Sequence, residues 1–253
     1  MFRALSRSIL CLLAATLALV QAAEIRLANG EWAPYLAEKA PHNGFASHVV
    51  TAAFDKVGVK VRYEFYPWAR ALSMVQNGEI AGSVVWSRSP EREPFALFSE
   101  PVITDEEVLF HLKEKPLSWN DVSDLRGKSI ATPLGSKLGM WEAPIKSGII
   151  RNQSVPNVEA AMKMLLAGRI DFLPMIRTVG YQTLRGKQFS DAERARIGHA
   201  SKVADKIDYR LMLSRKVAGN EQMLERFNEG LRQLRKSGEY AKMEADLQAG
   251  KYD

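Results

Sequence analysis

The chain has 253 residues, of which 46% are hydrophobic and 25% are charged, and its formal net charge is +6 at pH 7. This composition is typical of a globular protein with one large domain or two small ones. The 35 basic residues are interspersed with 29 acidic ones and form no basic arm, which argues against a nucleic-acid-binding protein.

Residues 1–22 have the pattern of a secretory signal peptide. Arg3 and Arg7 precede the apolar run Ile9 to Val20, and Ala22 closes a small-residue cleavage site. The apolar run is shorter than the ~20 residues that a membrane-spanning helix needs, so we expect cleavage rather than anchoring.

Processing would change the charge and the redox chemistry of the chain. Loss of Arg3 and Arg7 takes the net charge from +6 to +4, and Cys11, the one cysteine, leaves with them. The mature chain then has no disulfide and depends on its core for stability. We therefore expect a periplasmic protein, secreted through a cleaved signal peptide.

Strand-like and helix-like segments alternate from residue 24 onward. The apolar periodicity predicts strands at 24–28, 60–65 and 80–85, with helices at 45–57 and 67–77. Such alternation predicts an α/β fold with mostly parallel sheets.

Candidate ligand-binding residues follow two of these strands. In open α/β sheets, ligands bind beyond the carboxyl ends of the strands. Trp32 and Tyr35 follow the first strand, and Trp86 follows the third. Aromatic side chains often wall small-molecule pockets, although they are also common in plain cores. Trp68, in contrast, is expected in the core.

Two arginines in this half are candidate ligand contacts. Arg92 comes shortly after the third strand, and its guanidinium group offers a rigid fork of donors suited to a carboxylate. The alternative is a surface arginine paired with Glu91 or Glu93, worth only ~0–1 kcal/mol. Arg70 lies one helical turn past Pro67 and is either a ligand contact or a structural ion-pair partner.

The second half repeats the alternation. We expect a strand at 128–132, a helix capped by Asn157, and a late amphipathic helix that ends at Ser237-Gly238. The segment 165–170 echoes 75–80, with glycine and isoleucine in register 90 positions apart. This weak repeat suggests two similar lobes.

The lobes are expected to be joined by a hinge of two strands. Extended segments at 107–112 and 208–214 would carry the chain into the second lobe and back. This predicts lobe 1 at 23–108, lobe 2 at 109–210, and a return to lobe 1 with C-terminal helices at 211–253.

Two positions in the second half are candidate anion contacts. Gly135 and Ser136 stand between a strand and a helix expected to begin near Ser136, where free N–H groups favour an anion. An ordinary helix cap is the alternative. Arg177, which starts a helix after a strand, meets either an anion or solvent.

The sequence offers no pattern for a metal or a nucleotide cofactor, and we expect neither. The four histidines, His42, His48, His111 and His199, are dispersed without zinc-like spacing. The segment 135–139 lacks the spacing of a phosphate-binding loop.

Several motifs together suggest a family. Ser89-Pro90-Glu91-Arg92 with Phe98-Ser99-Glu100-Pro101 is similar to a T-P-E-R…F-S-x-P-Y signature. Two later stretches, 125–136 and 166–171, are similar to an L-x-G-K…G-T/S step and an L-x-x-G-R-x-D-A segment. In this order the motifs resemble the periplasmic solute-binding proteins of ABC importers that bind polar amino acids. Trp32–Tyr35 and Pro67–Ala71 resemble a less characterised branch of shorter members.

The resemblance implies the type II periplasmic binding protein fold, with a ligand cleft between two lobes joined by a two-strand hinge. It implies that Arg92 holds the ligand's carboxylate, that Ser87 assists, and that Gly135-Ser136 donate from lobe 2. Ile176 stands where the family has an acidic partner for the ligand's ammonium group, and Val102 replaces the final aromatic. A ligand with no amine, or with a second anionic group, therefore gains support.

We accordingly expect an exported, monomeric receptor, not an enzyme. It would capture a small carboxylate-bearing ligand, an amino acid or related molecule, by lobe closure and present it to an ABC permease in the inner membrane. One alternative is an exported dehydratase acting on prephenate or arogenate, with Glu31, Glu142 or Asp171 as the general acid or base. The other is a sensor that signals to a membrane partner.

Overall fold

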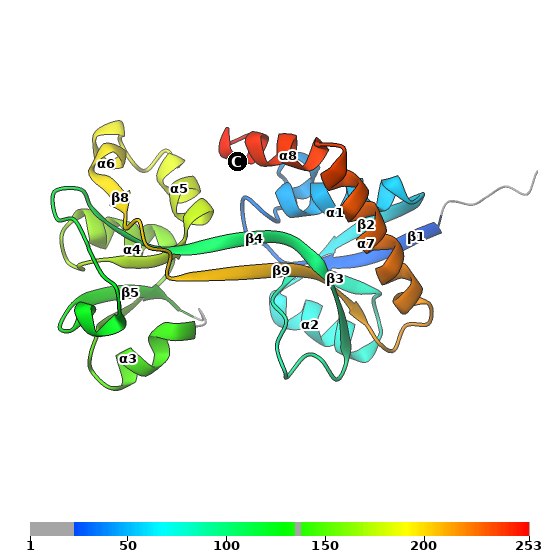
Figure 1. Cartoon of the computed structure of the whole chain (residues 1–253), viewed down its shortest axis with the longest axis horizontal. Helices are drawn as coiled ribbons and strands as arrows, with labels where there is room; N and C mark the ends of the chain where they lie inside the picture. The colour runs from blue at the N-terminus through cyan, green and yellow to red at the C-terminus, as the bar shows by residue number, and fades with distance from the viewer. Residues whose placement is uncertain (1–22, 135–137, 253) are drawn as a thin grey trace, which may run out of the picture.

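The computed structural model describes residues 23–134 and 138–252, so the expected signal peptide and Gly135-Ser136 lie outside the described residues. The described chain forms two α/β lobes that lie side by side along the long axis (Figure 1). Two long strands, β4 (Ala96–Leu112) and β9 (Asp205–Ser214), bridge them.

Lobe 1 is built on three parallel strands, β1 (Ala23–Asn29), β2 (Val59–Phe65) and β3 (Gly82–Trp86). Helices α1 (Phe45–Lys56), α7 (Asn220–Lys236) and α8 (Glu239–Gln248) share the largest apolar core with them, whereas α2 (Trp68–Asn77) packs in a separate cluster. β1 runs from the outer end of lobe 1 toward lobe 2 (Figure 1). The carboxyl ends of all three parallel strands therefore face lobe 2.

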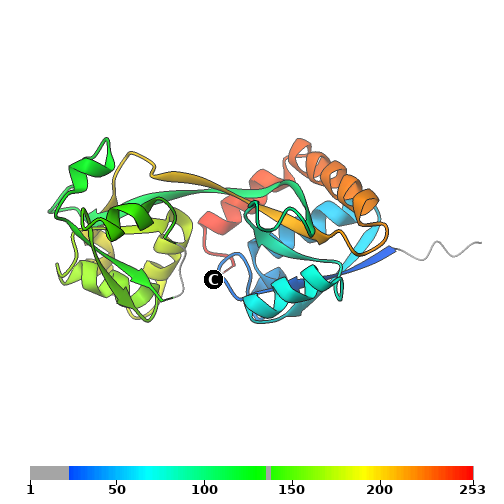
Figure 2. The same cartoon turned by 90° about the horizontal axis from the view of Figure 1, so that it is seen from below.

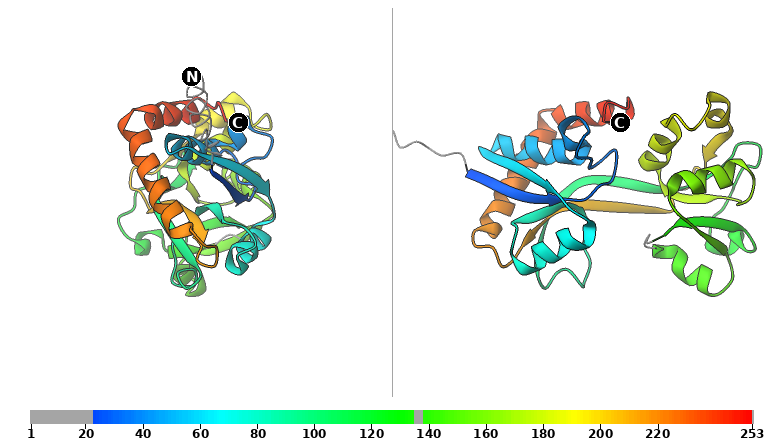
Figure 3. Two further views of the ribbon diagram at one scale, coloured as in Figure 1. Left: turned by 90° about the vertical axis from the view of Figure 1, so that its right-hand side faces the viewer. Right: turned by 180° about the vertical axis from the view of Figure 1, so that it is seen from behind.

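Lobe 2 contains a parallel pair, β5 (Ser129–Pro133) and β6 (Arg151–Val155), and two strands that pair with β4, β7 (Leu173–Ile176) and β8 (Ile197–His199). Its helices are α3 (Glu142–Lys146), α4 (Val158–Leu166), α5 (Arg177–Arg185) and α6 (Asp191–Arg196). Short 3-10 helices occur at η1 (Pro41–Asn43) in lobe 1 and at η2 (Val122–Leu125) and η3 (Gly139–Trp141) in lobe 2. The views from below and behind show the same two bodies with β4 and β9 between them (Figures 2 and 3).

The bridge runs through one continuous sheet. Its strand order is β2-β1-β3-β9-β4-β7, with β8 on β4, and the parallel order is broken where β9 and β4 enter antiparallel. Residues 108 and 210 lie inside these two strands, so the lobe boundaries expected there remain a proposal. The extended segments expected to form the hinge are parts of longer strands.

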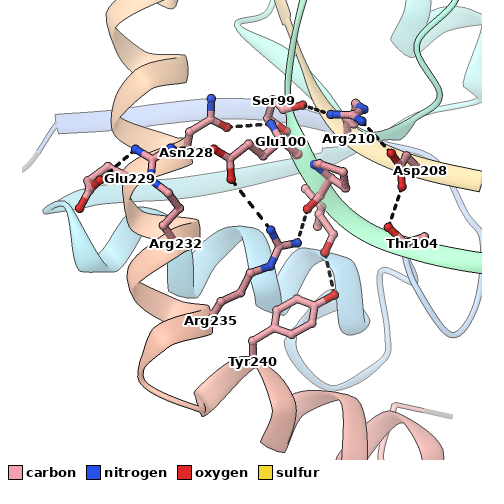
Figure 4. Close-up of polar contacts among 12 residues, drawn as sticks. Ser99, Glu100, Thr104, Asp208, Arg210, Asn228, Glu229, Arg232, Arg235 and Tyr240 are labelled. Carbon is pink, nitrogen blue, oxygen red and sulfur yellow. Dashed lines mark hydrogen bonds and ion pairs between the residues drawn. The ribbon is translucent and has the colours of Figure 1, made fainter.

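Polar contacts fix the lobe 1 end of the bridge to α7 and α8 (Figure 4). The Asn228 side chain accepts the Glu100 backbone N–H at 2.9 Å, and Arg232 pairs with the Glu100 carboxylate at 2.6 Å. Tyr240 donates to the carbonyl of Val102 at 2.9 Å. These contacts attach β4 to lobe 1 as far as Val102.

The expected strands and helices of the sequence correspond closely to β1, α1, β2, α2, β3, β5, α4 and α7. Asn157 caps α4 as expected, because its side chain accepts the N–H of Ala160 at 2.9 Å. The helix start expected near Ser136 lies outside the described residues, and the next helices of the described chain are η3 and then α3.

Candidate functional site

A cavity of about 350 Å³ opens at the carboxyl ends of the lobe 1 strands. It is lined by residues of the loops after β1 and β3, the end of β3, the start of α2 and one residue of β9. They are Trp32, Trp68, Val85, Trp86, Ser87, Arg92 and Tyr209. The cavity therefore combines a set of aromatic rings with one guanidinium group, at the place where α/β folds bind ligands.

Ser87 holds Arg92 in position. Its carbonyl oxygen accepts Nη1 of Arg92 at 2.8 Å and its Oγ accepts the same nitrogen at 3.3 Å. The guanidinium carbon lies 4.8 Å from the centroid of the Trp86 ring. Burial lowers the pKa of Arg92 from its ordinary value, a sign of partial desolvation. Within the described chain these bonds engage only Nη1, which leaves Nε and Nη2 able to donate to a carboxylate.

The aromatic walls are held by contacts with the strands. Trp86 donates from Nε1 to the buried Oγ of Ser83 at 2.7 Å, and its ring meets Trp68 edge-on at 5.4 Å. Trp68 lies against Gly30, where an added Cβ would come within 2.3 Å of the indole ring. Trp32 contacts Tyr209 edge-on, with ring centroids 4.9 Å apart. These rings are therefore positioned before any ligand arrives.

The residue before Trp86 has a strained backbone. Val85 has φ of 58°, a left-handed conformation that a β-branched side chain rarely adopts. The pairing of β3 with β9 shifts register between Ser83 and Trp86, as at a β-bulge. Strain of this kind is held by the surrounding structure and is concentrated at functional sites.

Charged side chains cluster beside the cavity on and around the two hinge strands, β4 and β9. Glu106 on β4 pairs with Arg177 at 3.0 Å and with Lys206 at 3.3 Å. Asp105 is buried, and desolvation raises its pKa to about 6 although hydrogen bonds from Glu106 and Thr178 lower it. Burial also raises the pKa of Glu107, which accepts from Nε1 of Trp141 in lobe 2 at 2.6 Å.

The structure gathers four of the expected site residues, Trp32, Trp86, Ser87 and Arg92, around one cavity. Tyr35 is not among the lining residues: it is only 2% exposed and packs in the lobe 1 core. Arg70 differs as well: it is exposed, and its guanidinium carbon lies 4.9 Å from the centroid of the Tyr66 ring. Arg177 is about half exposed and paired with Glu106 in the hinge, outside the cavity lining.

Sequence reasoning missed three residues of the lining. Trp68, expected in the core, directly follows the loop after β2. Ligands bind beyond the carboxyl ends of the strands, and this principle, used for β1 and β3, also applies to Trp68. Val85 lines the cavity because of its unusual backbone, for which the sequence gives no signal. Tyr209 comes from β9, far along the chain, and only the sheet order brings it here.

The carboxylates considered for acid or base catalysis lie outside this cavity and are engaged elsewhere. Glu31 accepts the N–H of Glu38 at 3.1 Å, and Glu142 pairs with Lys146 at 2.7 Å. Asp171 accepts both the N–H and the Oγ of Ser129 at 2.7 Å. Burial acts to raise the pKa of Asp171, but these hydrogen bonds lower it overall. In the part of the chain that the structure describes, no group of histidine, cysteine and acidic side chains has the arrangement of a metal site.

The family model of the bacterial extracellular solute-binding proteins, family 3, matches residues 27–247. The chain belongs to this family. The expected resemblance and the two-lobed α/β fold are thereby confirmed. No curated protein sequence matches this family 3 chain significantly.

Solved structures share its fold. A histidine kinase sensor domain similar to periplasmic binding proteins has a TM-score of 0.67 and 20% identity, over 89% of this chain and 96% of that one. Substrate-binding domain 2 of Lactococcus lactis GlnP, in an open conformation, has a TM-score of 0.66 and 19% identity, over 87% and 93%. The ancestral amino acid-binding protein AncCDT-1, a precursor of cyclohexadienyl dehydratase, has a TM-score of 0.62 and 20% identity, over 88% and 94%.

The described helices of this family 3 protein include none with the length and apolar character to span a membrane.

Proposed function

We propose that this chain is an exported receptor that captures a small carboxylate-bearing solute between its lobes and presents it to an ABC permease in the inner membrane. The observation that carries the proposal is Arg92, held by Ser87 at the mouth of an aromatic cavity with donors left over. A half-buried guanidinium group with free donors binds a carboxylate in a bidentate, charge-assisted manner. The periplasmic location follows the expected signal peptide.

The first test is a thermal-shift screen of the purified protein against amino acids, organic acids, polyamines and prephenate. A ligand at 100 times its dissociation constant stabilises the folded state by ~2.7 kcal/mol, which raises the melting temperature by about 5–10 °C. Arg92→Ala should weaken binding of any carboxylate ligand ~30-fold or more, because a desolvated charge pair costs ~2–5 kcal/mol when broken.

Arg88→Ala is the matched control. Arg88 lies in the same loop but is 65% exposed and pairs only with Glu93 among the contacts described, so its loss should leave affinity unchanged. A carboxylate ligand that binds Arg92→Ala as tightly as the natural protein would refute the assignment of Arg92.

Catalysis by this chain has less support. Glu31, Glu142 and Asp171 are engaged away from the cavity, so none is placed to transfer a proton to a ligand there. Formation of product from prephenate would reverse this conclusion. A sensor that signals to a membrane partner would use the same binding step. The membrane partner that co-purifies with the ligand-bound protein, a permease or a kinase, distinguishes transport from signalling.

A further inference from the structure

The lobe 1 cavity offers its ligand one charged group and otherwise an apolar surface. Among its described lining residues, Arg92 is charged, and Ser87 and Tyr209 each carry a hydroxyl group. The remaining walls are three indole rings, one phenol ring and Val85, and this lining contains no carboxylate. Once a carboxylate has met Arg92, the rest of the ligand contacts rings rather than polar partners.

An ammonium group on the ligand would be poorly compensated in this cavity. Aromatic faces attract cations, but Arg92 already lies over the ring of Trp86. One face of Trp68 is covered by Gly30. Three hinge carboxylates lie nearby, but none of them is among the described lining residues. Glu106 is already paired with Arg177 and Lys206, and Glu107 accepts from Trp141. Asp105 is buried, and desolvation raises its pKa to about 6. Burying an ammonium group without a partner is costly, so the cavity disfavours it.

Lobe 2 carries two exposed apolar side chains near the carboxyl end of β5. Leu134 directly follows β5 and Met140 lies in η3, and they are 70% and 38% exposed. They are the exposed large hydrophobic side chains of the described chain. The carboxyl end of β5 lies on the side of lobe 2 that faces lobe 1 (Figures 1 and 2). Covering such side chains on closure is favourable.

We propose that the ligand is a small monocarboxylate with an apolar or aromatic body and no ammonium group, and that Leu134 and Met140 cover this body when the lobes close. The proposal rests on the proposed function, because it takes Arg92 as the partner of the carboxylate. It extends that function by naming the substrate class. It also accounts for Ile176 at the position where the resemblance leads one to expect an acidic residue.

The decisive probes are pairs of acids that differ only in a positive charge. 3-Phenylpropanoate is L-phenylalanine without its ammonium group, and 3,3-dimethylbutanoate has the shape of glycine betaine with carbon in place of the charged nitrogen. Titration followed by tryptophan fluorescence suits a cavity lined by Trp32, Trp68 and Trp86. In at least one pair, we expect the acid without the positive charge (3-phenylpropanoate or 3,3-dimethylbutanoate) to bind at least tenfold more tightly than its partner. This corresponds to a difference in binding free energy of about 1.4 kcal/mol.

The proposed role of Leu134 and Met140 in covering the ligand is tested by Leu134→Asn and Met140→Gln. Each new side chain is close in size to the natural one. Because both side chains are exposed, the melting temperature of the unliganded variants should stay unchanged. Affinity for the acid that binds should fall at least fivefold. Glu142→Gln, exposed in the adjacent α3 and paired with Lys146, is the matched control and should leave affinity unchanged.

The outcomes separate this inference from the proposed function. Binding of L-arginine, L-glutamate or glycine betaine that depends on Arg92, with no binding of either uncharged-body acid, would overturn the substrate class and leave the carboxylate receptor standing. 3-Phenylpropanamide lacks the carboxylate. If it bound as tightly as 3-phenylpropanoate, both the carboxylate receptor and the proposed substrate class would be overturned. Unchanged affinity in both cover variants would overturn the role of Leu134 and Met140.

Discussion

Asp105 is a carboxylate that the fold buries without a full set of partners. It is 6% exposed, and Oδ1 accepts the backbone N–H of Glu106 at 2.8 Å. Oδ2 has no hydrogen-bond partner among the described residues. Desolvation is the largest influence on this group and raises its pKa from 3.8 to about 6, so Asp105 is protonated more readily in the folded state than in the unfolded one.

Asp105→Asn should therefore stabilise the protein at neutral and higher pH. Because the folded pKa lies above the unfolded one, the ionised carboxylate carries a penalty that is absent below about pH 4 and grows as pH rises through about 6. The asparagine removes this penalty and keeps the oxygen that accepts the Glu106 N–H. Relief of the ~3 kcal/mol penalty is offset in part by the new Nδ2, which replaces an oxygen without a described partner and costs ~1–3 kcal/mol when left unbonded. The free energy of unfolding at pH 8 should therefore rise by about 1 kcal/mol, measured by urea denaturation from pH 4 to 8.

Asp205→Asn is the control for this experiment. Asp205 lies on the neighbouring strand and accepts the N–H of Lys206 at 2.8 Å in the same manner, but its side chain is exposed. Asp205→Asn should change stability little, because this side chain is exposed. Destabilisation of Asp105→Asn at pH 8 would show that ionised Asp105 has a partner in solution.

At the scale of elements, the cavity depends on how α2 meets β1. The indole of Trp68, the first residue of α2, lies against the backbone of Gly30, the residue that follows β1. The space exists only because Gly30 has no Cβ. A rigid ring cannot yield as the end of a flexible side chain can, so any added atom there must displace Trp68.

Gly30→Ala should consequently lower both stability and ligand affinity. The new Cβ would come within 2.3 Å of the ring, an overpacking that typically costs ~1–3 kcal/mol. Affinity should fall with it because Trp68 forms part of the wall. Gly198→Ala in β8 is the control, since its Cβ would meet nothing closer than the flexible Lys113 at 3.3 Å. An unaltered dissociation constant in Gly30→Ala would mean that Trp68 is not a binding wall.

Helices were easier to predict from the sequence than the hinge strands. Amphipathic stripes and caps predicted α4 and α7 well, because each helix buries one face and its ends need local partners. The hinge strands are expected at 107–112 and 208–214; β4 and β9 end at those residues but begin earlier, β4 at Ala96 and β9 at Asp205. Their length comes from pairing with each other, a contact between distant segments that local periodicity does not carry.

For the whole molecule, the arrangement predicts closure on the ligand. The lobes are bridged by β4 and β9, whose lobe 1 end is fixed to α7 and α8 (Figure 4). The cavity is lined from lobe 1 and by Tyr209, so a ligand bound there gains contacts from lobe 2 only when the lobes approach each other.

Small-angle X-ray scattering should detect this closure. The radius of gyration should decrease when the protein is saturated with the carboxylate identified in the screen, and Arg92→Ala at the same ligand concentration should retain the unliganded value. A radius of gyration unchanged by saturating ligand would indicate that binding does not require the lobes to close.

The sequence by itself determined the family, the α/β class and most elements, and it singled out four residues that line one cavity, Arg92, Ser87, Trp32 and Trp86. These features follow from local pattern, since strand ends, caps and motifs are encoded by neighbouring residues. Only the tertiary structure decided that Tyr35 is buried, that Trp68 and Tyr209 complete the walls, and that Arg177 pairs with Glu106. Those outcomes depend on which distant segments pack together, and the free energy that selects the packing belongs to the whole core rather than to any one segment.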